Sequence, residues 1–462
     1  MKVNNRSKTI PSEIISYYLI LGGLFLLFLL CSFFYFFDHD EIETLHTAWK
    51  IWNGGVIYID FFQHHNPFLY YTLIPLLDSF GESILTIRIA RVIIAILDLF
   101  IYLVTYMIAV ELFEHKKTGL IAIILLSSLT IFFNKAIEIR PDVPQVLFGL
   151  MCIYFLILHF KKGSAKYALA SAMSLGMSFL FLQKAVFLII PIFIVQVFRI
   201  YKGKIEIQQI VLYWFSFTII LLPYAIYLFY KGWIKDYVFL NWTINIKQTE
   251  TFSLFNELTH SFLLNPFTWV FFVIGLFFLR KYLVREIGVL SLALLASVFV
   301  VRVPYQQYYM MFLPLMTIIA ANGFVNIITS KKTALYILIV AISLPMFTYV
   351  RKLVIRRNTE QIEKIQYVLS NTTKVDHVYD GKNIFNVFRK DLDFFWYSVD
   401  PNGGGLTTYQ VLSHYEYNIY ELIDKFKPKI ISNYHIEDLN HEVIINHYHN
   451  VPGFDDLLIR TD

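Results

Sequence analysis

The sequence is dominated by long runs of apolar residues that contain no charge. The first run, residues 14–37, holds no Asp, Glu, Lys or Arg. A helix needs about 20 mostly apolar residues to cross a bilayer, so this run predicts a membrane span. No small-residue cleavage pattern follows it, and we expect it to be retained. Further spans are predicted at about residues 86–112, 119–133, 143–160, 167–182, 185–199, 210–230, 263–279, 287–301, 305–322 and 335–350, which makes eleven in all.

The composition agrees with this interpretation. Hydrophobic residues make up 57% of the chain and charged residues 16%, whereas a typical soluble domain is roughly 45–50% apolar and about 25% charged. These values exclude a disordered chain and an ordinary soluble enzyme. Both cysteines, Cys31 and Cys152, fall inside apolar runs, so we expect neither a disulfide nor a cysteine metal site. No nucleic-acid partner is expected.

The linkers between the runs alternate in charge, and this alternation predicts an orientation. Cytoplasmic loops of membrane proteins carry an excess of Lys and Arg. The amino terminus is therefore expected in the cytoplasm and, with eleven spans, the tail outside, for a multi-pass protein of the inner or plasma membrane. The basic set comprises Lys2, Arg6, Lys8, Lys116, Lys117, Lys161, Lys162, Lys166, Arg199, Lys202, Lys204, Arg280, Lys281, Arg285, Lys331 and Lys332.

The chain becomes polar at Arg351, which predicts two parts. Residues 1–350 form a membrane domain that includes a first extracytoplasmic loop, residues 38–85, and residues 351–462 form a small soluble domain. Alternating helical and strand-like patterns in the tail favour an α/β unit outside the cytoplasm. The expected elements are helices at 362–370 and 409–426 and strands at 377–379, 429–432 and 457–460.

Four carboxylates stand at the exit of the first span, at Asp38, Asp40, Glu41 and Glu43. They are either interfacial charges that stop the helix from sliding or functional groups, and charges so close to hydrocarbon favour function. Apolar residues recur at helical spacing from Leu45 to Trp52 and predict an amphipathic helix on the membrane surface.

That helix also raises the question of a metal. His39, Glu43 and His46 are spaced to share one helix face, so a divalent ion is possible there. Such spacing is also a common accident, and no metal is the favoured interpretation.

Other polar groups lie at the same predicted side. Arg140, between Glu138 and Asp142, forms either a local ion pair or a phosphate clamp, because guanidinium binds phosphate oxygens bidentately. Lys184 and Arg302 are cations beside apolar runs, where they reach the interface or pair with an anion. The further candidates for a substrate pocket are His64, His65, Tyr305 and Tyr308.

These motifs, in their order along the chain, resemble the GT-C glycosyltransferases. The similarity includes the dolichyl-phosphate-mannose protein mannosyltransferases and the bacterial lipid A aminoarabinose transferase, and it covers about residues 14–350. The sequence carries it at Asp40-Glu41, Ala48, Gly54-Gly55, Tyr58, Asp60-Phe61-Phe62, His65-Asn66-Pro67, Glu138-Ile139-Arg140-Pro141-Asp142, Gln183-Lys184 and the stretch from Pro304 to Pro314.

The resemblance implies the fold and the reaction. The fold would be a polytopic α-helical membrane protein of GT-C type. The enzyme would move a hexosyl or pentosyl group from a polyprenyl-phosphate carrier to an extracytoplasmic lipid, polysaccharide or protein acceptor, with inversion. The motif maps the catalytic pair onto Asp40 and Glu41, with Asp40 as general base. A phosphate leaving group needs cations rather than a general acid. For these the candidates are Arg140, Lys184, Arg302 and His65.

One departure from the family pattern affects the donor. The aminoarabinose transferase has Glu-Lys-Pro where this chain has His65-Asn66-Pro67, so the lysine expected to meet the phosphate is absent. Either His64 or His65 supplies a donor, or the phosphate sits differently. The alternative function is a secondary transporter of a polar or anionic solute, although the sequence has no internal repeat and its charges lie at the rim rather than mid-span.

Overall fold

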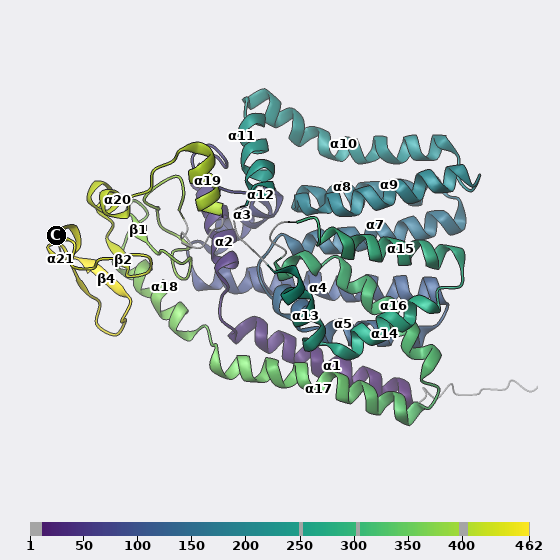
Figure 1. Cartoon of the computed structure of the whole chain (residues 1–462). Coiled ribbons are helices and arrows are strands. Elements are labelled where there is room, and N and C mark those ends of the chain that lie inside the picture. The colour runs from purple at the N-terminus through teal and green to yellow at the C-terminus, as the bar shows by residue number, and fades with distance from the viewer. Residues whose placement is uncertain (1–11, 249–252, 302–304, 397–404, 462) are drawn as a thin grey trace, which may run out of the picture.

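Helices built from the apolar runs make up most of the protein in a computed structural model, which describes residues 12–248, 253–301, 305–396 and 405–461. The bundle and its outer connections are shown in Figure 1. The helices up to residue 355 are α1 (Ser12–Phe34), α2 (His39–Trp52), α3 (Phe68–Phe80), α4 (Ile84–Phe113), α5 (Lys116–Ser128), α6 (Thr130–Ala136), α7 (Asp142–Lys162), α8 (Ala165–Phe181), η1 (Gln183–Ala185), α9 (Val186–Tyr201), α10 (Ile207–Lys231), α11 (Ile234–Val238), η2 (Phe239–Thr243), α12 (Ile244–Ile246), α13 (Leu254–Leu264), α14 (Pro266–Phe277), α15 (Tyr282–Ser297), η3 (Gln306–Tyr309), α16 (Phe312–Ile327) and α17 (Lys331–Ile355).

Each predicted span overlaps a helix or a pair of helices. Among the described residues, six helices are long and apolar enough to cross a membrane. The number rises to eight if each of two bent pairs is one span, and further apolar helices, such as α16, are shorter. A polytopic helical fold is therefore confirmed, whereas the count of eleven stays a prediction.

The two bent pairs meet at one asparagine. The chain turns by 73° between α5 and α6, and by 103° between α13 and α14. Each break frees backbone groups that must find partners in a buried setting. Asn265, at the second break, accepts a hydrogen bond from the backbone N–H of Thr130 (3.0 Å) and donates one to the carbonyl of Ser128 (3.1 Å). Pro266, at the first position of α14, lacks an N–H that would otherwise need a partner.

The membrane helices end beside a small mixed sheet, at the left of Figure 1. Helix α18 (Thr359–Asn371) leads to β1 (Val378–Tyr379), and the remaining elements are α19 (Gly405–Ser413), α20 (Ile419–Phe426), β2 (Ile430–Ser432), α21 (Glu442–Ile445), β3 (Tyr448–Asn450) and β4 (Leu457–Arg460). The strand order is β1-β2-β4-β3. Strand β1 is parallel to β2, with Val378 opposite Ile430, and β4 is antiparallel to both its neighbours.

The tail differs from the prediction in two places. The prediction of one helix at 409–426 is wrong, because the helical structure is interrupted between α19 and α20. His414 adopts a positive φ of 54°, which ends α19, and the side chain of Asn418 caps α20 by accepting from the N–H of Tyr420. Strand β3 was not predicted, since Tyr448-His449-Asn450 has no apolar alternation.

The tail packs directly on the loop of residues 35–67 between α1 and α3. The backbone N–H of Phe62 donates to the carbonyl of Phe394 (2.8 Å), and the indole of Trp396 donates to the carbonyl of Phe62 (3.0 Å). Gln361 of α18 binds both the N–H and the carbonyl of Phe37. These contacts join segments more than 300 positions apart, so the loop and the tail share one hydrophobic core.

Candidate active site

The site begins at the amino terminus of α2, which a capping box defines. Asp38 is the cap: its side chain accepts from the backbone N–H of Asp40 (3.2 Å), and its own N–H donates to the carboxylate of Glu41 (2.9 Å). The arrangement satisfies helix N–H groups that have no partner within the helix. It also places Asp38 and Asp40 where the helix dipole favours negative charge.

Glu41 lies inside the protein rather than at an accessible surface. Its carboxylate has no exposed area and forms a bidentate pair with Arg91 of α4, at 2.8 Å from Nε and 2.5 Å from Nη2. Arg91 also donates to the carbonyls of Ser32, Tyr35 and Phe36 at the end of α1. This clamp fixes α2 to α1 and α4, and so determines where Asp40 points.

Arg140 connects Asp40 to the segment between α6 and α7. Its Nη1 forms an ion pair with Asp40 and lies 3.1 Å from Glu138, and its Nε lies 3.3 Å from Asp142. The guanidinium is 3% exposed, whereas a quarter of the Asp40 side chain is exposed. Arg140 was expected to form either a local ion pair or a phosphate clamp, and the structure shows the local ion pairs. Among these three carboxylate partners, Asp40 is the one at the surface.

A second cation completes the outer rim of this charge cluster. Lys135 lies 2.9 Å from Glu138 and 3.7 Å from Asp38. Burial raises the pKa of Glu138 well above its ordinary value, and the neighbouring Asp38 carboxylate adds to the shift against the opposing effect of Lys135. The pKa of Asp38 is lowered, because Lys135, His39 and Arg140 together outweigh its burial.

Lys184 stands on the other side of Asp142. Its Nζ is 3.1 Å from a carboxylate oxygen of Asp142 and 4.1 Å from the centre of the Tyr308 ring. Lys184 and Tyr308 line a small cavity of about 20 Å³. Phe187, Leu294 and neighbouring side chains of α7, α9 and α15 form the rest of its wall. A cation therefore stands beside a small cavity whose lining is half polar and half apolar. Tyr305 precedes η3 and Tyr308 lies within it, whereas Arg302 is outside the described residues.

The two histidines of the first loop lie beside Lys184, with their rings 4.1 Å apart. Burial, helped by the Lys184 charge, lowers the pKa of His64 to about 4. The pKa of His65 falls well below its ordinary value, with burial again the main cause. Both rings are then neutral at pH 7. Each can donate one hydrogen bond to a phosphate, but neither adds a positive charge.

Gln183 holds this loop in place. Its amide donates to the carbonyl of His64 (2.8 Å) and accepts from the backbone N–H of Asn66 (3.2 Å). Asn66 in turn donates to the carbonyl of Phe179 (2.6 Å). The position of the loop is thus tied to η1, which carries Lys184.

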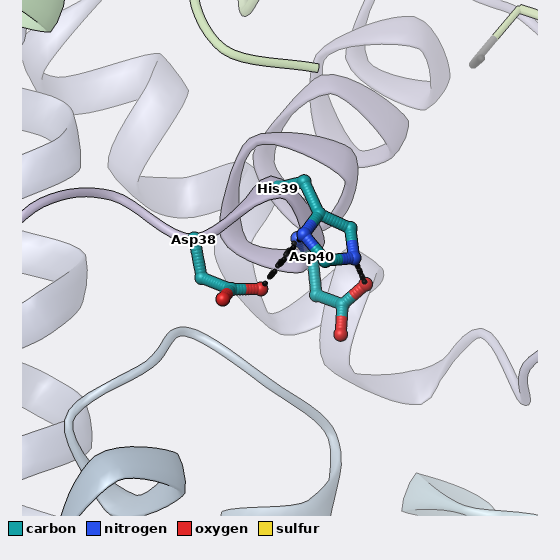
Figure 2. A group of neighbouring side chains, drawn as sticks. All are labelled: Asp38, His39 and Asp40. Carbon is teal, nitrogen blue, oxygen red and sulfur yellow. Dashed lines mark hydrogen bonds and ion pairs between the residues drawn. The ribbon is translucent and has the colours of Figure 1, made fainter. Parts of the chain in front are cut away.

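The residues that could hold a metal are not those expected from spacing. Glu43 is buried and accepts from Gln63 (3.1 Å), and His46 is buried against the tail, so the set with His39 is not brought together. His39 instead lies between Asp38 (3.3 Å) and Asp40 (3.2 Å), as Figure 2 shows. Their ligand atoms lie within 4.8 Å of one another. These nitrogen and oxygen ligands suit a divalent ion.

A second set of buried charges supports α2 from the tail. Asp391 binds His46 Nε2 (2.8 Å) and forms an ion pair with Lys50. Burial lowers the pKa of Lys50 to about 8 against the opposing effect of Asp391. The amino-terminal turn of α2 is therefore held by Arg91, and its later turns are held by the tail together with Glu82 and Asp78, which accept from Trp49 and Trp52.

Sequence reasoning missed Arg91, Lys135 and Asp391. A signal existed for Arg91, since a cation inside an apolar run is costly unless it is paired. Lys135, in the last turn of α6, had no distinguishing neighbour in the sequence. Asp391 had none either, because it is separated from His46 by 345 positions.

Comparisons with known proteins agree with this fold. Residues 64–230 match the family model described as dolichyl-phosphate-mannose-protein mannosyltransferase, a span that includes His64, Arg140 and Lys184 but not Asp40. No curated protein sequence matches the chain.

Three solved structures share the overall arrangement. ArnT from Cupriavidus metallidurans bound to undecaprenyl phosphate is 10% identical, with a TM-score of 0.69 over 96% of this chain and 97% of that one. The oligosaccharyltransferase AglB from Archaeoglobus fulgidus, in complex with an inhibitory peptide and a dolichol-phosphate, is 13% identical, with a TM-score of 0.56 over 90% and 69%. The arabinofuranosyltransferase AftD from Mycobacteria is 11% identical, with a TM-score of 0.51 over 96% and 40%. The GT-C fold predicted from the sequence is thus confirmed.

Proposed function

We propose that this protein is an integral-membrane glycosyltransferase that takes a sugar from a polyprenyl-phosphate donor and transfers it, with inversion, to an acceptor outside the cytoplasm. One observation carries the proposal. Asp40 is a partly exposed carboxylate, and Lys184 is a cation that lines a small cavity of mixed polarity. The two are joined through Arg140 and Asp142. A general base and a phosphate site are the two groups this transfer needs. The similarity to ArnT, whose structure holds undecaprenyl phosphate, supports this donor class.

In the proposed reaction Asp40 is the base. It accepts the proton of the acceptor hydroxyl as that oxygen forms a bond to the anomeric carbon. The bond from this carbon to the donor phosphate oxygen breaks at the same time, and polyprenyl phosphate leaves with the electron pair. Attack opposite the leaving group inverts the anomeric configuration. Glu41, buried against Arg91, positions Asp40 and does not touch the substrate.

The donor phosphate would be held by Lys184, with neutral His64 or His65 adding a hydrogen bond. Arg140 has two successive partners in this scheme, Asp40 and the donor phosphate. Without donor it is paired to Asp40, and an arriving phosphate competes for the guanidinium because it offers bidentate acceptors. Transfer of Arg140 from Asp40 to the phosphate would release the base only when donor is present.

The remaining assignments follow if the acceptor lies outside the cytoplasm, as proposed. Glu138 and Asp142 position the cations, and Tyr308 lines the cavity beside Lys184. Tyr305, which directly precedes η3, is a further candidate for contact with the substrate. The N-terminus is cytoplasmic, and residues 351–462 form an extracytoplasmic domain attached to the membrane domain of residues 1–350. The acceptor class stays open among lipid, polysaccharide and protein.

The test compares cell-envelope glycans, by mass spectrometry, from cells that express wild-type protein, Asp40→Asn or no protein. We expect one glycan modification to require the wild-type chain and to be absent with Asp40→Asn at equal membrane abundance. Asp424→Asn, an exposed change of the same kind in α20, is the matched control and should retain the modification. Full modification with Asp40→Asn would exclude this base. Loss of solute uptake in place of a glycan would support the transporter.

A further inference from the structure

A groove between α1 and α4 adjoins the site described above at Arg91 but extends away from it. Its volume is about 180 Å³. Three polar residues line it, Ser32 of α1 with Arg88 and Arg91 of α4, and all three lie toward the helix ends that adjoin α2. The other lining side chains are apolar, and those farthest from the polar end are Phe25 and Leu99. The groove is therefore polar at one end and apolar along the rest.

Its length fits one leaflet of a bilayer. Arg88 and Leu99 are eleven positions apart on one helix, which corresponds to roughly 16 Å at 1.5 Å per residue. Half of the hydrocarbon core of a typical bilayer is about 15 Å. A chain that enters beside Arg88 would thus reach about the bilayer midplane at Leu99.

The charges at the polar end do not balance. Arg91 is buried and neutralised by Glu41. Arg88 is exposed and forms no hydrogen bond or ion pair with any residue in the described part of the chain. The nearest acidic residue on the chain, Glu82, is already paired with Arg389 and Lys374. One positive charge is left at the mouth of an apolar groove.

We propose that this groove binds one acyl chain of an anionic phospholipid from the surrounding leaflet, with the lipid phosphate facing Arg88. A zwitterionic lipid would leave the extra positive charge uncompensated, which is why the net-negative class is preferred. The site is distinct from the donor pocket, because the two share no lining residue. The lipid would contact Arg91 and thereby stabilise the clamp that holds α2.

Native mass spectrometry of the full-length protein in detergent tests this proposal. Phosphatidylglycerol and phosphatidylcholine with the same acyl chains are added to delipidated protein. Wild type should retain phosphatidylglycerol preferentially, and Arg88→Gln should weaken that binding about fivefold, the factor typical of one basic residue facing an anionic lipid. Lys235→Gln removes an exposed cation of the same predicted side, on α11, and should leave the preference unchanged.

A second variant separates the chain site from the charge. Ile96→Trp fills part of the groove, and Ile96 is 45% exposed, so the larger ring has room toward the lipid. This change should weaken binding of both lipids. Equal retention of the two lipids by wild type, or an unchanged preference in Arg88→Gln, would overturn the proposal. Displacement of phosphatidylglycerol by polyprenyl phosphate in wild type but not in Arg88→Gln would also overturn it, since the groove would then belong to the donor.

Discussion

Two buried arginine–glutamate pairs lie in different parts of the bundle and have different surroundings. Arg91 binds Glu41 beside the candidate site, and Arg199 of α9 binds Glu286 of α15 near the far end of the helix that follows Lys184. In both pairs the guanidinium meets the carboxylate through Nε and Nη2. Both are less than one-tenth exposed.

The surroundings make the difference. Arg199 packs on the Phe160 ring at 3.5 Å and near Tyr282 at 5.8 Å. Among the described residues, its partner Glu286 forms an ion pair with no second cation. Glu41 lies beside a network in which Arg140 and Lys135 face the partly exposed carboxylates of Asp40 and Asp38, and Lys184 faces the buried carboxylate of Asp142. One pair closes a packing contact, whereas the other anchors an open cluster. The same arginine–glutamate pair can therefore be purely structural or can support a site, depending on which charged side chains lie beside it.

The largest effect is expected at Asp40, outside both pairs. Asp40→Asn removes the base and should lower sugar transfer by about 10²–10⁴-fold. The midpoint of thermal unfolding should stay close to that of wild type, because this side chain is a quarter exposed. The measurement is transfer rate per folded protein, beside thermal unfolding in detergent. A variant with wild-type rate would remove Asp40 from the mechanism.

Breaking the two pairs separately sharpens the comparison. Arg199→Met leaves Glu286 buried without its partner and should cost about 3–5 kcal/mol of stability, with the transfer rate per folded molecule unchanged. Arg91→Met should lower the stability by a similar amount. It should also lower sugar transfer, because the clamp that fixes α2 and orients Asp40 is lost. The check is thermal unfolding and transfer for both variants. Equal kinetic effects of the two changes would contradict the distinction drawn here.

Lys184 should affect donor binding more than folding. Lys184→Gln removes a charge-assisted contact to phosphate and should weaken the apparent donor affinity by about 10–100-fold. Lys281→Gln is the control, because this lysine is exposed and, within the described part of the chain, pairs with the exposed Glu114 alone. Titration of polyprenyl phosphate against each variant measures the difference, and equal affinities would count against the phosphate site.

The smallest effect is a pH dependence at Glu43. Burial raises its pKa from 4.5 to about 7. The folded protein then holds a proton that the unfolded chain has lost, so this residue makes stability fall as pH rises from about 4.5 to 7. Glu43→Gln should remove that slope. Thermal unfolding across this interval compares the two, and parallel curves would show that Glu43 does not cause it.

Parts of the fold were open to prediction because their signals are local. The apolar runs locate the helices, and Asp38 with Glu41 three positions on defines the start of α2. The break at His414 was not predictable, since a positive φ is uncommon even at histidine and no glycine or proline marks this position. Within the site, Arg140 beside Glu138 and Asp142 could be expected from neighbourhood alone. The partner of Asp391 could not, because no local pattern links it to His46.

The sequence by itself determined that this chain is a polytopic helical protein with its reactive groups gathered in a few polar stretches. The reason is that a bilayer imposes a length and a composition on every span, and both can be read along the chain. Tertiary structure alone decided which carboxylate is buried and which is accessible. Asp40 and Glu41 are adjacent and chemically alike, but successive helix residues point in different directions. Glu41 therefore binds Arg91 in the interior, whereas Asp40 binds Arg140 and keeps a quarter of its side chain exposed.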